Sequence, residues 1–120
     1  MKLHTAIESV AFAPRPADFD AAVAAAFSPA DLEAASGLPA RSVAGRVALK
    51  RAVRVLLADL LAIDVPLFAI RVAGGGAARP TVSLAGGSDD RAAALCGRLH
   101  VSISHSRNVA LGAAVAEVAP

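Results

Sequence analysis

Four cationic side chains stand close together in the segment 42–62, SVAGRVALKRAVRVLLADLLA. They are Arg46, Lys50, Arg51 and Arg54, and the first, second and fourth are spaced four residues apart. Because residues four apart are neighbours on a helix, this spacing forms a cationic stripe, with Arg51 beside it. The stripe predicts an anion-binding site, since arginine and lysine side chains suit phosphate. The alternative is a solvated helix face that binds nothing.

A second concentration of polar groups lies in the segment 98–117, RLHVSISHSRNVALGAAVAE. Strand alternation places His100, Ser102 and Ser104 on one side of the strand. His100 and His105 are five residues apart, so a regular strand cannot bring both to one metal, and no other ligands are placed nearby. Ser104 adjoins His105, but the Gly-x-Ser-x-Gly elbow of a hydrolase is absent. A metal site, a hydrolytic pair and a polar strand face with hydrogen-bonded histidines are the alternatives on spacing alone.

Helices and strands that could position these groups are expected throughout the chain. A short helix begins at Pro29, with Ser28 as its N-cap and Gly37 after its end. Ser42 and Ser88 are expected to cap the two later helices. The expected strands cover 3–12, 68–73, 79–85, 99–104 and 109–118, with a Gly-Gly-Gly-Ala turn at 74–77, and the other helices cover Ala17–Ala26, 42–62 and Asp89–Arg98. This order predicts a single α+β domain over residues 1–120, with an antiparallel sheet packed on a long helix.

Composition excludes several classes of function. The 120 residues carry a net charge of +2, with no block of basic residues and neither Trp nor Tyr, which argues against nucleic acid as a partner. The only cysteine, Cys96, cannot form an internal disulfide. Glu8 interrupts the first apolar residues, and no apolar run reaches the roughly 18 residues of a membrane span. We therefore expect a cytoplasmic protein with no membrane partner, and the Ala, Arg and Gly usage indicates a bacterial source.

Three segments together resemble the holo-acyl-carrier-protein synthases, the small phosphopantetheinyl transferases. FSPADLEAA (27–35), SVAGRVALKRA (42–52) and HVSISHSRNVALGAAVAE (100–117) are similar to motifs of that family, and RPTVSL (79–84) stands where the family has Gly-Lys-Pro and a strand. The resemblance implies a 4'-phosphopantetheinyl transferase-like fold and a homotrimer with sites between subunits. It also implies that Mg²⁺ holds coenzyme A while a carrier-protein serine attacks the β-phosphate, which releases 3′,5′-ADP.

The sequence departs from this family at both positions where the resemblance implies a metal ligand. Ala6 stands in place of an aspartate, and Arg51 stands in place of a glutamate. A shift of two residues would bring Glu8 to the first position, but its neighbours would then match less well. Mg²⁺ requires oxygen ligands, and a fixed cation repels it. These substitutions make Mg²⁺ a doubtful cofactor, while coenzyme A remains a candidate ligand.

The favoured hypothesis is a protein that has lost Mg²⁺-dependent transfer and is repurposed, for example in lipid or secondary (polyketide-type) metabolism. It would bind a carrier protein or a pantetheine-linked acyl intermediate, or catalyse different chemistry such as a cyclisation. The alternative is an active transferase in which Arg51 takes part of the role of the metal. The candidate catalytic residues are Lys50, Arg51 and His105. The candidate phosphate-binding residues are Arg46, Lys50, Arg54, Ser104 and His105, and the resemblance implies that Ser104 and His105 face the stripe from a neighbouring subunit.

Overall fold

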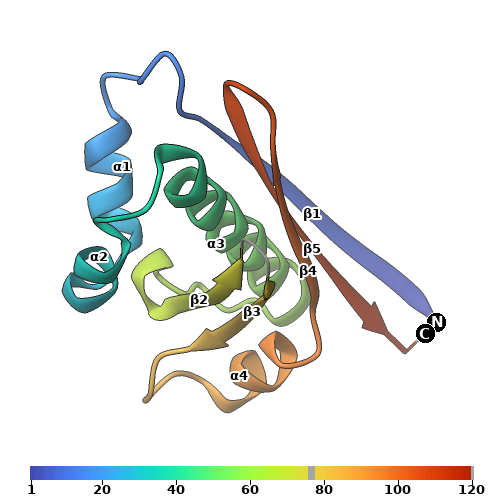
Figure 1. The fold of residues 1–120 in the computed structure, drawn as a ribbon. Coiled ribbons are helices and arrows are strands. Elements are labelled where there is room, and N and C mark those ends of the chain that lie inside the picture. Colours follow the sequence, from blue (N-terminus) through green and yellow to red (C-terminus); the bar gives the residue numbers. More distant parts are fainter. Residues whose placement is uncertain (76–77, 120) are drawn as a thin grey trace.

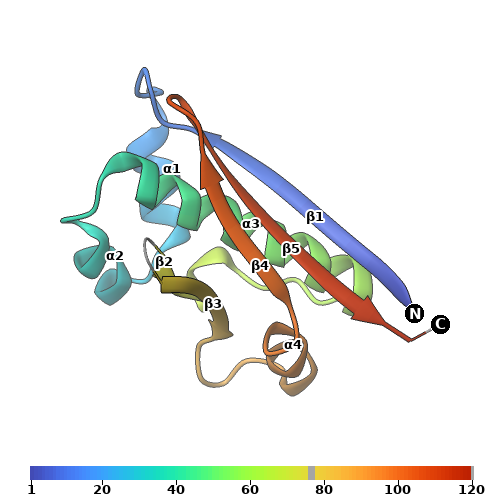
Figure 2. The same ribbon diagram turned by 45° about the vertical axis from the view of Figure 1, so that its right-hand side comes forward.

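A three-stranded antiparallel sheet covers one side of a long helix, and a smaller two-stranded sheet and three short helices surround the rest of that helix (Figures 1 and 2). The computed structural model describes residues 1–75 and 78–119. In chain order the elements are β1 (Lys2–Ala11), α1 (Phe19–Ala26), α2 (Pro29–Ala35), α3 (Ala40–Leu61), a 3-10 turn (Leu67–Ala69), β2 (Ile70–Gly75), β3 (Ala78–Leu84), α4 (Asp90–Cys96), β4 (His100–His105) and β5 (Val109–Val118).

The larger sheet has the strand order β1-β5-β4, with every neighbouring pair antiparallel. The pairing of β1 with β5 runs without interruption from Lys2 opposite Val118 to Ala11 opposite Val109. The strands β2 and β3 form a separate antiparallel pair. The expected α+β architecture with an antiparallel sheet on a long helix is therefore confirmed.

Small residues set the short distance between α3 and the larger sheet. A Cβ atom added at Gly112 on β5 would overlap the main chain of Leu49 on α3. A Cβ atom added at Gly45 on α3 would lie 2.5 Å from the Cγ2 atom of Ile103 on β4. The adjoining positions are largely alanines that are fully buried, Ala44, Ala48, Ala52, Ala110 and Ala114. The alanine-rich composition is thus used to bring helix and sheet backbones together.

The expected positions of the strands and helices are close to the observed ones, and two of the three expected caps are wrong. The Ser28 side chain accepts a hydrogen bond from the Asp31 main-chain N–H at 3.3 Å, as predicted for an N-cap. Ser42 lies inside α3, because the helix begins at Ala40 directly after the extended Pro39. Asp89 rather than Ser88 caps α4, since its carboxylate accepts from two main-chain N–H groups of the first turn.

Two further differences concern the middle strands. The start of the expected strand 68–73 is a 3-10 turn, so β2 begins at Ile70. Phe68 in that turn is exposed. The turn expected at 74–77 lies partly outside the described residues. None of the described helices has the length and apolar character needed to cross a membrane.

The face of the larger sheet that points away from α3 carries no helix (Figure 2). Alternation along β1 and β5 places Leu3, Ile7 and Leu111 on this face. These side chains are 63%, 61% and 41% exposed. This uncovered face is mixed, because it also carries Ser102 and Ser104 of β4 and His100, whose Nε2 atom lies 3.5 Å from the Glu117 carboxylate.

Candidate functional site

The four cations of the predicted stripe all lie on α3, but they have four different environments. Successive residues of a helix are about 100° apart around its axis, so Arg51 points well away from Lys50. Lys50 is 1% exposed, Arg46 and Arg51 are half-buried, and Arg54 is exposed. The stripe is therefore not a uniform solvated face, and each cation has to be considered separately.

Lys50 is buried against the main chain of the segment that leads into β2. Its Nζ atom donates a hydrogen bond to the Ile70 carbonyl oxygen and a longer one, 3.4 Å, to the Leu67 carbonyl oxygen. The ammonium also lies 4.5 Å from the centre of the Phe27 ring, a cation–π contact. Burial lowers the pKa of Lys50 from 10.5 to about 8, although the nearby Asp31 carboxylate acts in the opposite direction.

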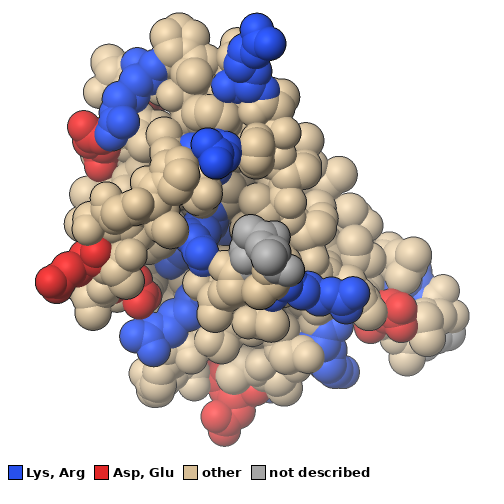
Figure 3. Space-filling model, viewed as in Figure 1, with Lys and Arg blue, Asp and Glu red and all other residues tan. Residues whose placement is uncertain are grey.

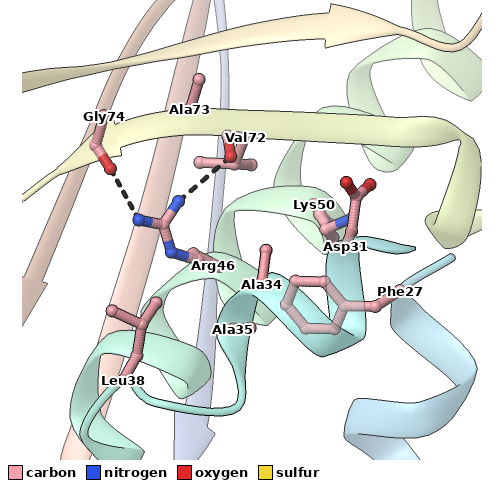
Figure 4. A pocket seen from close by; sticks show the side chains of 10 residues that line it. All are labelled: Phe27, Asp31, Ala34, Ala35, Leu38, Arg46, Lys50, Val72, Ala73 and Gly74. Atoms are coloured by element: carbon pink, nitrogen blue, oxygen red, sulfur yellow. Dashed lines mark hydrogen bonds between the residues drawn. The ribbon is translucent and has the colours of Figure 1, made fainter. Parts of the chain in front are cut away.

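Arg46 binds the same strand one turn earlier along α3. Its guanidinium donates to the Val72 carbonyl oxygen at 3.0 Å and to the Gly74 carbonyl oxygen at 2.7 Å. Figure 4 shows Arg46 on one side of a cavity of about 290 Å³, with Lys50 and Phe27 on the other. Much of the donor capacity of Arg46 and Lys50 is thus already used to hold β2 against α3.

A second cavity of about 490 Å³ adjoins the first, and Arg46 and Leu38 line both. It brings Arg41, Arg46 and His105 together within one chain. Figure 3 shows lysine and arginine side chains around a hollow on this side of the molecule. No carboxylate is found among the described residues that line this cavity, so this lining is cationic and suits an anion.

The two hairpin candidates are separated by strand alternation. His105 lines the second cavity, and its Nδ1 atom lies 3.2 Å from the Ser106 carbonyl oxygen. Ser104 is exposed, and alternation places it on the uncovered face of the sheet, away from Arg46. A single chain therefore joins His105 to the cations of α3 but does not join Ser104 to them.

Arg51 lies on another side of α3, in a cavity of about 110 Å³ between α1 and the end of β1. Asp18 and Phe19 contribute to the same cavity. Within residues 1–75 and 78–119, no hydrogen bond or ion pair holds its guanidinium. Among the described residues, Arg51 therefore keeps its donors free for an incoming anion, unlike Arg46 and Lys50.

The residues at the expected metal positions do not fit Mg²⁺. Ala6 is 7% exposed and offers no oxygen ligand, and Arg51 offers a positive charge. Glu8, two residues along β1, lies on the same face of the strand as Ala6 and is a single carboxylate. Among the described residues there is no cluster of three or more His, Cys, Asp or Glu side chains that could hold a metal ion. We therefore derive no chemical step through a metal.

Three residues that line these cavities were not identified from the sequence. They are Phe27, Asp31 and Arg41. Phe27 and Asp31 reach the first cavity because α2 packs beside β2, and no spacing within the sequence signals that contact. Arg41 belongs to the first turn of α3, which begins earlier than expected.

The fold is that of the holo-acyl-carrier-protein synthases, as solved structures with closely similar architecture show. The Helicobacter pylori holo-acyl-carrier-protein synthase in complex with coenzyme A has a TM-score of 0.63 to this chain at 19% identity, covering 95% of this chain and all of the other. The Plasmodium yoelii acyl carrier protein synthase with ADP bound has a TM-score of 0.68 at 14% identity, covering 97% of both chains. The apo synthase of Chronobacterium ammoiniagenes has a TM-score of 0.63 at 21% identity, covering 95% of both. No protein-family model and no curated protein sequence matches the chain.

Proposed function

We propose that this protein uses the holo-acyl-carrier-protein synthase fold to bind coenzyme A or a pantetheine-linked acyl intermediate without Mg²⁺, and that it does not perform Mg²⁺-dependent phosphopantetheinyl transfer. The observation that carries the proposal is the pair Ala6 and Arg51. One position has lost its oxygen ligand, and the other presents a half-buried guanidinium with free donors. A similar structure that contains coenzyme A supports the choice of ligand class.

The polar residues of the cavities would bind the anionic groups of the ligand. Arg51 would bind a phosphate oxygen directly, because a guanidinium can donate two parallel hydrogen bonds to a phosphate group. Arg41 and His105 would bind a second anionic group in the 490 Å³ cavity. Arg46 and Lys50 would keep β2 in place through their hydrogen bonds to its carbonyl oxygens. A guanidinium cannot bridge two phosphates at about 2.1 Å as Mg²⁺ does, so the transfer reaction loses its main stabilising charge.

The homotrimer that the resemblance implies would form through the uncovered sheet face. Leu3, Ile7 and Leu111 would be removed from water if copies of this chain packed there, which favours association. Packing of this kind would also place Ser104 at a subunit boundary. Sedimentation would measure the assembly directly, and Ile7→Lys is expected to convert it to monomers. A wild-type chain that sediments as a monomer at micromolar concentration would refute this part of the proposal.

Calorimetry with coenzyme A, in Mg²⁺ and in chelator, tests the binding. We expect the same Kd in both buffers. Arg51→Ala should weaken binding about 10-fold or more, because a hydrogen bond to a charged group contributes about 1.5–3 kcal/mol. Arg54→Ala is the matched control on the same helix, since Arg54 is exposed and lines none of the described cavities, and we expect less than a twofold change.

Mass measurement of an apo carrier protein incubated with this protein and coenzyme A separates the two functional hypotheses. We expect no gain in mass with or without Mg²⁺, while a known transferase modifies the same carrier. A gain in mass in either buffer would establish the transferase alternative. Failure to bind either coenzyme A or carrier protein would overturn the binding function itself.

A further inference from the structure

The 290 Å³ cavity between α2, α3 and β2 contains a lysine to which the proposed function gives no contact with coenzyme A (Figure 4). Its walls are mostly apolar and include Phe27, Leu38 and Val72. Its polar groups are Asp31, Arg46 and Lys50. An apolar cavity with a few convergent polar groups is the usual form of a small-molecule site.

Lys50 has the environment of a nucleophilic amine. It is 1% exposed, and the groups around it are two carbonyl oxygens, an aromatic ring, the Asp31 carboxylate and the more distant cations of Arg46 and Arg71. With a pKa of about 8, on the order of a tenth of the amine is neutral at pH 7, which is about 300 times the fraction in an ordinary lysine. Desolvation in an apolar cavity is one of the ways in which proteins activate lysine as a nucleophile.

Asp31 brings to this cavity a carboxylate oxygen that has no hydrogen-bond donor in the described part of the chain. Its Oδ2 atom is buried and has no hydrogen-bond partner among the described residues. The nearest cation is the Arg71 Nε atom at 3.6 Å, which is an ion-pair distance rather than a hydrogen bond. A buried acceptor without a donor is costly, and a ligand that brings a hydroxyl group would satisfy it.

We propose that this cavity is a covalent binding site in which Lys50 captures a small aldehyde or ketone as a Schiff base, with the apolar part of the ligand against Phe27 and Leu38. The neutral Nζ atom attacks the carbonyl carbon, and a proton moves from nitrogen to oxygen to give a carbinolamine. The carbinolamine hydroxyl can donate to Asp31. That hydroxyl then leaves as water with one proton from solvent, and a carbon–nitrogen double bond forms.

The protonated imine formed on Lys50 can keep most of the contacts that the lysine ammonium makes. The protonated imine keeps one N–H, which continues to donate to the Ile70 carbonyl oxygen. The hydrogen bond that is given up is the longer one, to Leu67. The Asp31 carboxylate balances the positive charge of the imine. This inference does not rest on coenzyme A binding, since it uses neither Arg51 nor His105.

Reductive trapping on the whole protein tests the proposal, because the chain has only two lysines, Lys2 and Lys50. The protein is incubated with propanal and cyanoborohydride between pH 6 and 9, and alkylation of each lysine is followed by peptide mass spectrometry. We expect Lys50 to react at least 10-fold faster than Lys2 at pH 7. The rate at Lys50 should level off above about pH 8, whereas an ordinary lysine amine reacts faster up to its pKa of about 10.4.

Two variants on one helix show whether the reaction occurs through the cavity. Ala34 is exposed and lines the cavity, so Ala34→Phe should slow alkylation of Lys50 at least fivefold and leave Lys2 unchanged. Ala30 is exposed on the same helix and lines none of the described cavities, so Ala30→Phe should change neither rate. Equal rates at Lys50 in these two variants would contradict entry through the cavity.

Cys96 provides a control for unfolding in the same sample. Its thiol is 3% exposed and lies outside this cavity, although it lines a separate cavity beside β3 and β4, so an increase in maleimide labelling above the rate of the untreated protein reports opening. Alkylation of Lys50 without such an increase at Cys96 would support the proposal. An unreactive Lys50, or one that reacts only when labelling of Cys96 increases, would overturn it and would assign Lys50 a purely structural role.

Discussion

The stability of the protein is expected to change with alkaline pH in three steps, because two buried groups titrate with opposite effects. Burial lowers the pKa of Lys50 from 10.5 to about 8 in the folded state. Between pH 8 and 10.5 the unfolded chain therefore binds a proton that the folded protein lacks, and the free energy of unfolding rises with pH. The slope is about 1.4 kcal/mol per pH unit, and the full range corresponds to about 3 kcal/mol.

Cys96 opposes this rise at higher pH. Burial raises the pKa of its thiol from 9.0 to about 11, so between these values the folded protein keeps a proton that the unfolded chain has lost. The free energy of unfolding then falls with the same slope. The sum is a rise of about 1.4 kcal/mol from pH 8 to 9, a plateau to about pH 10.5, and a fall above it. The chain has no tyrosine, so no phenol titrates in this range.

Urea denaturation at pH 7, 8, 9, 10 and 11, at constant ionic strength and protein concentration, measures this profile. Lys50→Met keeps the length of the side chain and removes the amine, so the rise between pH 8 and 9 should disappear. Cys96→Ala should extend the rise to about pH 10.5. A wild-type stability that stays level or falls between pH 8 and 9, or a Lys50→Met variant that retains the rise, would refute the assignment of a buried amine at Lys50.

Two predictions concern the packing and capping that position the site. Gly112→Ala should destabilise the protein by about 3 kcal/mol, because the new methyl group overlaps the main chain of α3, whereas Gly37→Ala has open space and should stay within about 0.5 kcal/mol in the same urea assay. Asp89→Ala should cost about 1 kcal/mol through loss of the α4 cap, and Ser88→Ala should cost less; an equal or reversed order in thermal melts would contradict the capping by Asp89.

The elements of the fold could be predicted from local signals, and the environments of the cations could not. Alternation in HVSISH and the proline–glycine punctuation of the short helix identify structures that form within a few residues. The four-residue spacing of Arg46, Lys50 and Arg54 correctly places them along one side of α3. It does not determine what packs there, because Phe27 and the carbonyl groups of β2 come from segments about 20 residues away in either direction.

The arginine at position 51, where the resemblance implies a glutamate, has a clearer meaning once the contacts of each cation are known. If Arg46 and Lys50 were free, the replacement of a glutamate by Arg51 would add one more charge to an already strong anion site. Instead their hydrogen bonds hold β2, and Arg51 is the half-buried cation of the stripe with free donors among the described residues. Arg51 therefore differs from Arg46 and Lys50, whose donors are used in structural contacts.

Arg51 and Lys50 also face different cavities, although they are adjacent in the sequence. The 100° step of the helix separates them, and neither cavity shares a described lining residue with the other. A phosphate group bound by Arg51 and a carbonyl compound captured by Lys50 would therefore not compete for the same space. Coenzyme A at saturating concentration is expected to leave the rate of Lys50 alkylation unchanged within twofold. Complete protection of Lys50 by coenzyme A would instead join the two cavities into one site, and would require a ligand that passes from Arg51 around α3 to β2.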